Sequence, residues 1–139
     1  MPTFTPLVSA EPFVRTWLAT QFPAPIRVVT ELPSDLGAAP TIQVTRFGGA
    51  DDELVLDSAN VDIDCFDDDH DSKTARENAR TLSEQVRTAL RLHLPGYATG
   101  GAAVQSVTTI SAPRWVPYDN TKLRRFVASY RITIHSIPS

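Results

Sequence analysis

The alternation of apolar and polar residues is clearest near the end of the chain. Every second side chain there is apolar: Phe126, Ala128, Tyr130, Ile132 and Ile134. The side chains between them are mostly polar: Val127, Ser129, Arg131, Thr133 and His135. A period of two is typical of a strand with one buried face. Shorter stretches rich in apolar and β-branched residues predict strands at 26–30, 41–47, 61–66 and 104–111.

A period of 3.6 residues predicts one long helix in the middle of the chain, from Ser72 to Leu94. Its apolar face consists of Ala75, Ala79, Leu82, Val86, Ala89, Leu90 and His93, so that the histidine is interpreted as a core residue. A second face carries four arginines, which we call the arginine stripe: Arg76, Arg80, Arg87 and Arg91. An earlier helix, with Ser9 as its N-cap, is predicted to end at about Phe22.

Short links between the strands favour an antiparallel sheet. Gly48-Gly49 allows a tight reversal after the strand at 41–47. Residues 51–58 are predicted to form an exposed hairpin and loop, and residues 112–120 an irregular loop with exposed aromatic side chains. The order α-β-β-β-α-β-β predicts an α+β fold class: a mostly antiparallel sheet of four to five strands packed with two helices, one long. A single domain should cover residues 1–139, with an extended N-terminal arm at about 1–8.

The composition is that of an ordinary globular chain. Its 139 residues, of which 42% are hydrophobic, suffice for one core. The single cysteine, Cys65, excludes an internal disulfide, and its inward position on a strand predicts a buried thiol. No apolar run approaches the roughly 20 residues of a membrane span, and the first residues lack the pattern of a signal peptide. We therefore expect a soluble protein that is intracellular when made.

Charge is sorted along the chain, although the net charge is only −3. Residues 47–72 contain ten acidic side chains and no Lys or Arg, whereas residues 73–139 contain ten basic side chains against three acidic ones. In one interpretation, the acidic strand and the basic helix are adjacent and neutralise each other within one molecule. In the other, an acidic patch on one copy meets the arginine stripe of the next copy head to tail. The second interpretation requires that the arginines are not all engaged within their own molecule.

The aspartate run between strand and helix suggests a metal site only weakly. Asp67, Asp69 and Asp71 begin like a calcium loop, but Ser72 stands where that loop needs glycine and Asn78 where it needs glutamate. The match therefore fails at two positions that the geometry of the loop requires, and we predict no metal site.

No motif for catalysis or cofactor binding is present either. The chain lacks a phosphate-binding P-loop and a G-x-S-x-G turn, and its three histidines are not spaced as metal ligands. We predict that the protein is not an enzyme, with no catalytic residue and no cofactor. A metal-dependent nuclease that uses the Asp-rich loop together with Asp62 and Asp64 remains the less favoured alternative.

The arginine stripe allows three interpretations. Glu77 and Glu84 lie three or four residues from several of the arginines, which favours a solvated, salt-bridged face. The stripe could instead form a subunit interface. Contact with nucleic-acid phosphates is the third interpretation, and the acidic net charge disfavours it.

Several stretches together resemble a known family. They are residues 40–49 (PTIQVTRFGG), 61–66 (VDIDCF) with the Ala/Arg-rich helix that follows, 94–96 (LPG), 113–120 (PRWVPYDN) and 124–134 (RRFVASYRITI). In order and spacing they resemble the tail terminator (tail completion) proteins of long-tailed phages (siphophages), in the form found in actinobacteriophages. The resemblance covers most of the chain from about residue 10 and does not depend on any single motif.

The resemblance implies a structural protein of the virion. Such a subunit assembles as a ring, expected to be hexameric, at the head-proximal end of the viral tail, where it ends tube polymerisation and provides the head–tail joining surface. The implied partners are further copies of the chain, the tail tube protein and a head-side connector protein, while DNA passes through the lumen without specific binding and no membrane is involved. Assembly would take place in the host cytoplasm. Another head–tail connector subunit or a tail tube subunit is the alternative.

Two groups of residues are candidate contact sites under this hypothesis. The subunit interface or lumen is assigned to Arg76, Arg80, Arg87, Arg91, Asp62, Asp64, Asp67, Asp68 and Asp69. A partner-docking loop is assigned to Arg114, Trp115 and Tyr118, because exposed aromatic side chains and arginine are enriched at protein contacts.

Overall fold

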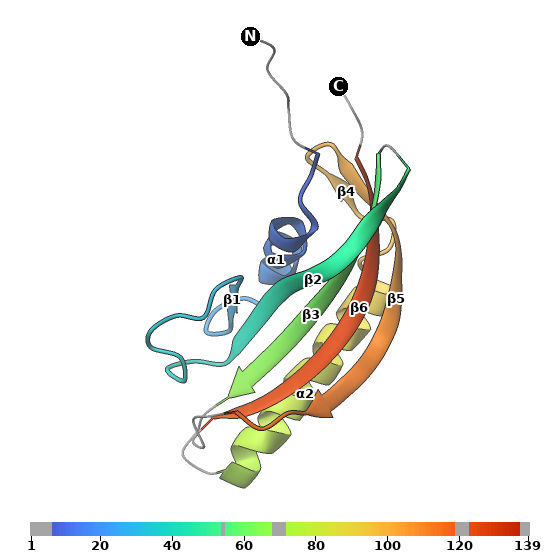
Figure 1. Ribbon diagram of the computed structural model, residues 1–139. Helices are drawn as coiled ribbons and strands as arrows, with labels where there is room; N and C mark the ends of the chain where they lie inside the picture. Colours follow the sequence, from blue (N-terminus) through green and yellow to red (C-terminus); the bar gives the residue numbers. More distant parts are fainter. Residues whose placement is uncertain (1–6, 54, 68–71, 119–122, 137–139) are drawn as a thin grey trace.

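The computed structural model contains, in its described residues, two helices and six strands (Figure 1). They are α1 (Ala10–Gln21), β1 (Arg27–Val29), β2 (Thr41–Glu53), β3 (Leu56–Asp67), α2 (Ser72–Leu92), β4 (Ala98–Thr99), β5 (Ala102–Trp115) and β6 (Arg124–Ser136). The structure describes residues 7–53, 55–67, 72–118 and 123–136, without the side chains at 52, 53, 72 and 73. The first six residues of the predicted arm therefore lie outside the described residues.

The strands form one sheet in the order β1-β2-β3-β6-β5-β4. Neighbouring strands run antiparallel, except that β1 and β2 are parallel. The predicted α+β class with a mostly antiparallel sheet is thus confirmed. The described residues form six strands, against the four or five predicted, because the two-residue strand β4 pairs with Ala102 and Ala103 of β5.

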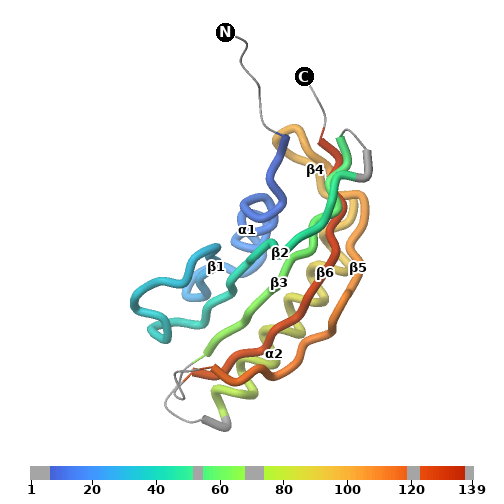
Figure 2. Tube along the Cα trace, viewed as in Figure 1, coloured from blue at the N-terminus to red at the C-terminus, as the bar shows by residue number. Residues whose placement is uncertain are grey.

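Both helices lie on the same face of this curved sheet (Figure 2). α1 packs on β1 and β2, whereas α2 packs on β3, β6 and β5. One hydrophobic core joins the two layers, with Val14 and Leu18 from α1, Val86 and Leu90 from α2, and Ile63 from β3, all completely buried. The predicted inward positions of β6 are confirmed, since the buried residues include Phe126, Ala128, Tyr130, Ile132 and Ile134.

The tight reversal that Gly48-Gly49 would allow is not formed. β2 continues through both glycines, and the turn of the β2–β3 hairpin lies between Glu53 and Leu56. The pairing register of β2 on β3 shifts just before Gly48, which identifies a β-bulge. Gly49 has a φ of +113°, and a Cβ atom there would lie 2.0 Å from the carbonyl oxygen of Ser58. A side chain would therefore not fit at Gly49.

Two other predicted boundaries also differ from the structure. β5 extends to Trp115, so residues 112–115 are part of a strand and not of an irregular loop. Pro113 is tolerated because this strand lies near the edge of the sheet, next to a register shift. α2 ends at Leu92, and His93 is exposed, so its interpretation as a core residue is wrong; Leu94 is buried instead. None of the described helices is long and apolar enough to cross a membrane.

Candidate functional site

The face of the sheet opposite the helices is polar. Asp62 and Asp64 of β3 lie on it, because they alternate with inward residues such as Ile63. The hydroxyl of Ser129 on β6 donates a hydrogen bond to the carboxylate of Asp62. The guanidinium of Arg125, also on β6, lies 3.8 Å from the carboxylate of Asp64. Both carboxylates are therefore engaged by the neighbouring strand.

A short segment after β5 covers one end of this polar face. The ring of Tyr118 packs against Phe66 with 5.3 Å between ring centroids, and the guanidinium of Arg125 lies 5.1 Å from the centre of the Tyr118 ring. The side chain of Asp64 keeps only 17% of its surface exposed. Burial raises the pKa of Asp64 to about 6, against the opposing effect of the Arg125 charge, and nearby Asp62 raises the pKa further.

The sheet separates the acidic strand from the arginine stripe. α2 lies on the inner face, whereas Asp62 and Asp64 lie on the outer one. Among the described residues, the ion-pair partner of Asp64 is Arg125 and no member of the stripe. The interpretation that the basic helix neutralises these two aspartates is therefore wrong. Asp67 is buried at the end of β3, and Asp68 and Asp69 lie outside the described residues.

Every arginine of the stripe has a partner within the molecule. The guanidinium of Arg76 lies over the Trp115 ring, 4.1 Å from its centroid. Arg80 and Arg87 each pair with the carboxylate of a glutamate three residues earlier on α2, namely Glu77 at 2.7 Å and Glu84 at 3.8 Å. Arg91 donates a hydrogen bond of 3.2 Å to the hydroxyl of Thr109. The intrahelical pairs expected of a solvated helix face are thus present. The head-to-tail interpretation required arginines that are free to contact another copy, and the arginine stripe as a whole does not meet that requirement.

Arg91 differs from the other members of the stripe. Its partner, the hydroxyl of Thr109, is neutral, and no carboxylate of the described residues lies within ion-pair distance of its guanidinium. The neighbouring Arg87 is held only loosely, because its pair with Glu84 is long and both side chains are more than 40% exposed. Positive charge therefore remains uncompensated at this end of α2.

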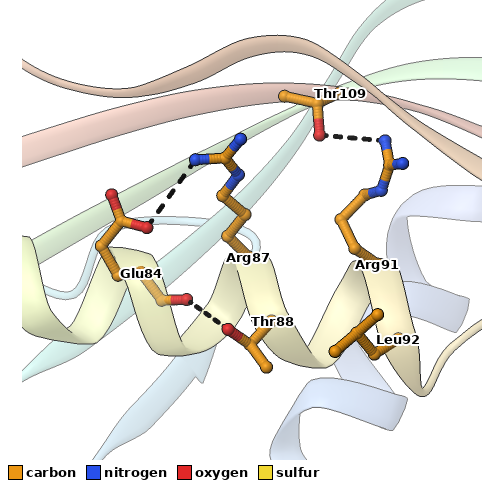
Figure 3. Close-up of a pocket in the computed structure, with 6 residues that line it drawn as sticks. All are labelled: Glu84, Arg87, Thr88, Arg91, Leu92 and Thr109. Carbon is orange, nitrogen blue, oxygen red and sulfur yellow. Dashed lines mark hydrogen bonds and ion pairs between the residues drawn. The ribbon is translucent and has the colours of Figure 1, made fainter.

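A groove of about 460 Å³ lies between α2 and β5 at this point (Figure 3). Its lining consists of Glu84, Arg87, Thr88, Arg91, Leu92 and Thr109. Figure 3 shows the side chains of Arg87 and Arg91 extending on the same side of the helix, toward Thr109 of β5. Two guanidinium groups and one carboxylate line the groove, which makes it basic; we call it the basic groove.

Tyr130 of β6 supports the wall of the basic groove. It lies opposite Thr109 in the β5–β6 pairing and is completely buried. Its hydroxyl has no hydrogen-bond partner in the described part of the chain. Burial raises the pKa of Tyr130, so the phenol stays neutral at physiological pH. The charge of the groove therefore comes from Glu84, Arg87 and Arg91 of its lining.

The edge of β5 next to the basic groove is largely unpaired. β4 covers only Ala102 and Ala103, and the backbone of Val104 exchanges hydrogen bonds with residues 96 and 97. Within the described ranges, no strand pairs with this edge from Ser106 to Trp115. Backbone donors and acceptors along such an edge are available for an added strand.

Exposed apolar side chains accompany this edge. Leu92 at the end of α2 is 72% exposed, Ile110 on β5 is 47% exposed and Trp115 is 43% exposed. The site thus combines positive charge, free backbone groups and apolar contact area. That combination suits the binding of an extended, acidic polypeptide segment.

The predicted docking loop does not form one surface. Arg114 and Trp115 belong to β5, and Trp115 lies on the helix side of the sheet, where Arg76 covers its ring. Tyr118 packs on the opposite side, against Phe66, and is only partly exposed. Trp115 is therefore the one of the two predicted aromatic residues that keeps a large exposed area.

Metal and thiol chemistry find little support in the described residues. These residues contain no group of three His, Cys, Asp or Glu side chains that could hold a metal ion, while residues 68–71 of the aspartate run lie outside them. Cys65 is completely buried, as predicted, and burial raises the pKa of its thiol. The thiol is therefore protonated and inaccessible.

Sequence reasoning missed three residues of this site. Leu92 carried a signal, because it falls outside the apolar face of a 3.6-residue helix. Ile110 carried none, because its place on β5 depends on register shifts between Val104 and Ser106 and between Thr109 and Ser111. Thr109 carried no signal, because nothing in the sequence places it beside Arg91. Its role depends on where α2 lies on the sheet.

Comparison with models of known protein families gives no match, and comparison with curated proteins gives none either.

Proposed function

We propose that the chain is a structural subunit of a phage tail: a tail terminator that assembles as a ring on the tail tube, ends tube growth and offers the surface for head–tail joining. The proposal has two supports. The first is the resemblance to that family, in order and spacing, of most of the chain from about residue 10. The second is a feature of the sheet, and it carries the most weight.

The sheet has two unlike free edges. On one side, β5 is unpaired from Ser106 to Trp115 within the described residues. On the other side, β1 covers only the first three residues of β2, and the backbone N–H of Arg46 donates to the Glu11 carboxylate at 2.8 Å. Beyond that point, the outer edge of β2 has no strand beside it in the described part of the chain.

Free edges of this length favour assembly over a monomeric state. Proteins that stay monomeric usually shorten, cover or charge their edge strands. When the two free edges differ, contact between them is heterologous, and copies related by rotation form a ring if the rotation closes. A subunit that caps a tube must form such a closed assembly. A tube subunit would instead continue into an open filament.

Sedimentation of the purified chain, alone and with its tail tube subunits, tests this proposal. We expect a closed oligomer, visible as rings by electron microscopy, either alone or when tube subunits are present, and shorter tubes when the chain is added to polymerising tube protein. A chain that stays monomeric in both conditions would contradict the proposal. Open filaments of the chain alone would favour a tube subunit.

A further inference from the structure

We propose that the free edge of β5, together with the basic groove, is the strand-accepting half of the contact between copies, and that it binds the free edge of β2 at residues 47–51 of a second copy. This inference rests on the proposed function, since it assumes that copies associate. It goes further by naming the two surfaces that meet.

Strand direction permits this contact. β2, β3, β6 and β5 alternate in direction, so β5 runs antiparallel to β2 within one molecule. Copies related by rotation about an axis along the strands keep these directions. β5 of one copy then meets β2 of the next in antiparallel orientation, and the sheet continues its own pairing pattern across the contact.

Charge favours β2 as the occupant. Arg91 is uncompensated and lies at Thr109, next to the position on β5 that would face Ala50. β2 ends in Asp51-Asp52-Glu53, and the described side chain of Asp51 is exposed. Pairing of β5 with β5 of a second copy would bring the Arg91 side chains of both copies together about a two-fold axis. Like charges at close approach disfavour that arrangement.

Apolar side chains are exposed on both surfaces. Phe47, at the bulge of β2, is 51% exposed, and Leu92 and Ile110 are exposed on the accepting side. A strand-to-strand contact would remove part of this area from water, at about 25 cal/mol per Å². The free part of β2 thus offers backbone groups, negative charge and an apolar side chain to a surface with the matching features.

Single cysteines test this contact directly. Ala50 on β2 and Thr108 on β5 are both exposed, and their register partners Ser58 and Arg131 place both on the face opposite the helices. A disulfide needs its two Cα atoms within about 4.4–6.8 Å and its side chains on the same face. Ser106→Cys, two residues from Thr108, covers an alternative register.

We expect a 1:1 mixture of separately tagged Ala50→Cys and Thr108→Cys chains to give a mixed covalent dimer on oxidation. Each variant alone should give at least tenfold less covalent dimer. A chain with both cysteines should give a series of covalent oligomers of increasing size. Gln21→Cys, exposed at the end of α1, is the matched control and should give background only. The native Cys65 is completely buried and should not contribute.

Two results would overturn the inference while leaving the proposed function intact. One is a ring by sedimentation without mixed disulfides at either Thr108 or Ser106. The other is a Thr108–Thr108 dimer as the main product, which would show pairing of β5 with itself. A chain that remains monomeric with tube subunits present would overturn the proposed function and this inference together.

Discussion

Asp64 is a carboxylate in a nearly buried position on the polar face of the sheet. The guanidinium of Arg125 lies beside it and also donates to the carbonyl oxygen of Pro117. The pKa of Asp64 rises to about 6 because burial outweighs the attraction of the Arg125 guanidinium. An unfolded aspartate has a pKa of about 3.9. Between these two values the folded protein binds the proton more tightly than the unfolded chain, so protonation stabilises the fold.

We predict that Asp64→Asn reduces the loss of stability between pH 4 and pH 7. Because the folded pKa is raised to about 6, the contribution of Asp64 is fully present below pH 4 and is lost as pH rises through 6. A two-unit difference corresponds to about 2–3 kcal/mol at most, reduced by residual solvent screening. Urea denaturation at both pH values measures the change.

Asp35→Asn is the control for that prediction. The pKa of Asp35 is lowered, chiefly by a hydrogen bond from Arg27, so its effect has the opposite sign: it stabilises the fold at higher pH and is lost as pH falls. Its replacement should not flatten the decline between pH 4 and pH 7. An unchanged decline in the Asp64→Asn variant would contradict the assigned burial of Asp64.

At the scale of the elements, the close packing of β2 on β3 just after the bulge requires a glycine. We predict that Gly49→Ala destabilises the fold by about 2–5 kcal/mol, from a left-handed φ and the overlap of Cβ with the Ser58 carbonyl oxygen. Gly96→Ala is the matched control, because Gly96 has a φ of +88° but nothing within 4 Å of the added Cβ. Gly96→Ala should lower the free energy of unfolding by only about 1–2 kcal/mol. Equal losses in urea denaturation would contradict the close approach at Gly49.

The same bulge shows what a sequence can and cannot predict. A tight turn and a bulge both use glycine at positive φ, so Gly48-Gly49 fits either one. The distinction depends on whether 50–53 pair with a later strand, which is a long-range property. Strand β6 and helix α2 were predictable because each shows its period over ten or more residues with one apolar face.

The candidate site was predictable only in part. The arginine stripe follows from the helical period, and so does the position of Arg91 on it. The neutral partner of Arg91 does not follow from the helical period, because Thr109 is 18 residues away and lies beside the helix only as a result of the strand order. The free edge of β5 likewise depends on β4 being two residues long.

At the scale of the whole molecule, the acidic strand and the arginine stripe lie on opposite sides of the sheet. Asp62 and Asp64 occupy the polar face, the arginine stripe runs along α2 on the other side of the sheet, and β2 ends in acidic residues. Most of the described charges nevertheless have a partner nearby. Under the proposed assembly, the charges at the two free edges guide how copies meet.

This distribution makes Arg91, rather than the stripe as a whole, the charge that should matter for assembly. We predict that Arg91→Glu weakens association of copies about tenfold or more, because it removes the uncompensated cation and places a carboxylate where the acidic end of β2 would bind. Arg80→Glu is the matched control on the same helix: Arg80 is exposed, pairs with Glu77 and does not line the basic groove.

Sedimentation at low and high salt separates this electrostatic effect from damage to the fold. Exposed charges more than about 10 Å apart are screened at 0.1 M salt, and a contact made partly of charge weakens as salt rises. The difference between Arg91→Glu and the native chain should therefore shrink at high salt, while backbone pairing along β5 keeps some association in both. If Arg80→Glu weakened the association of copies equally, the whole arginine stripe would belong to the interface. If Arg91→Glu did not weaken association, the basic groove would lie outside the interface.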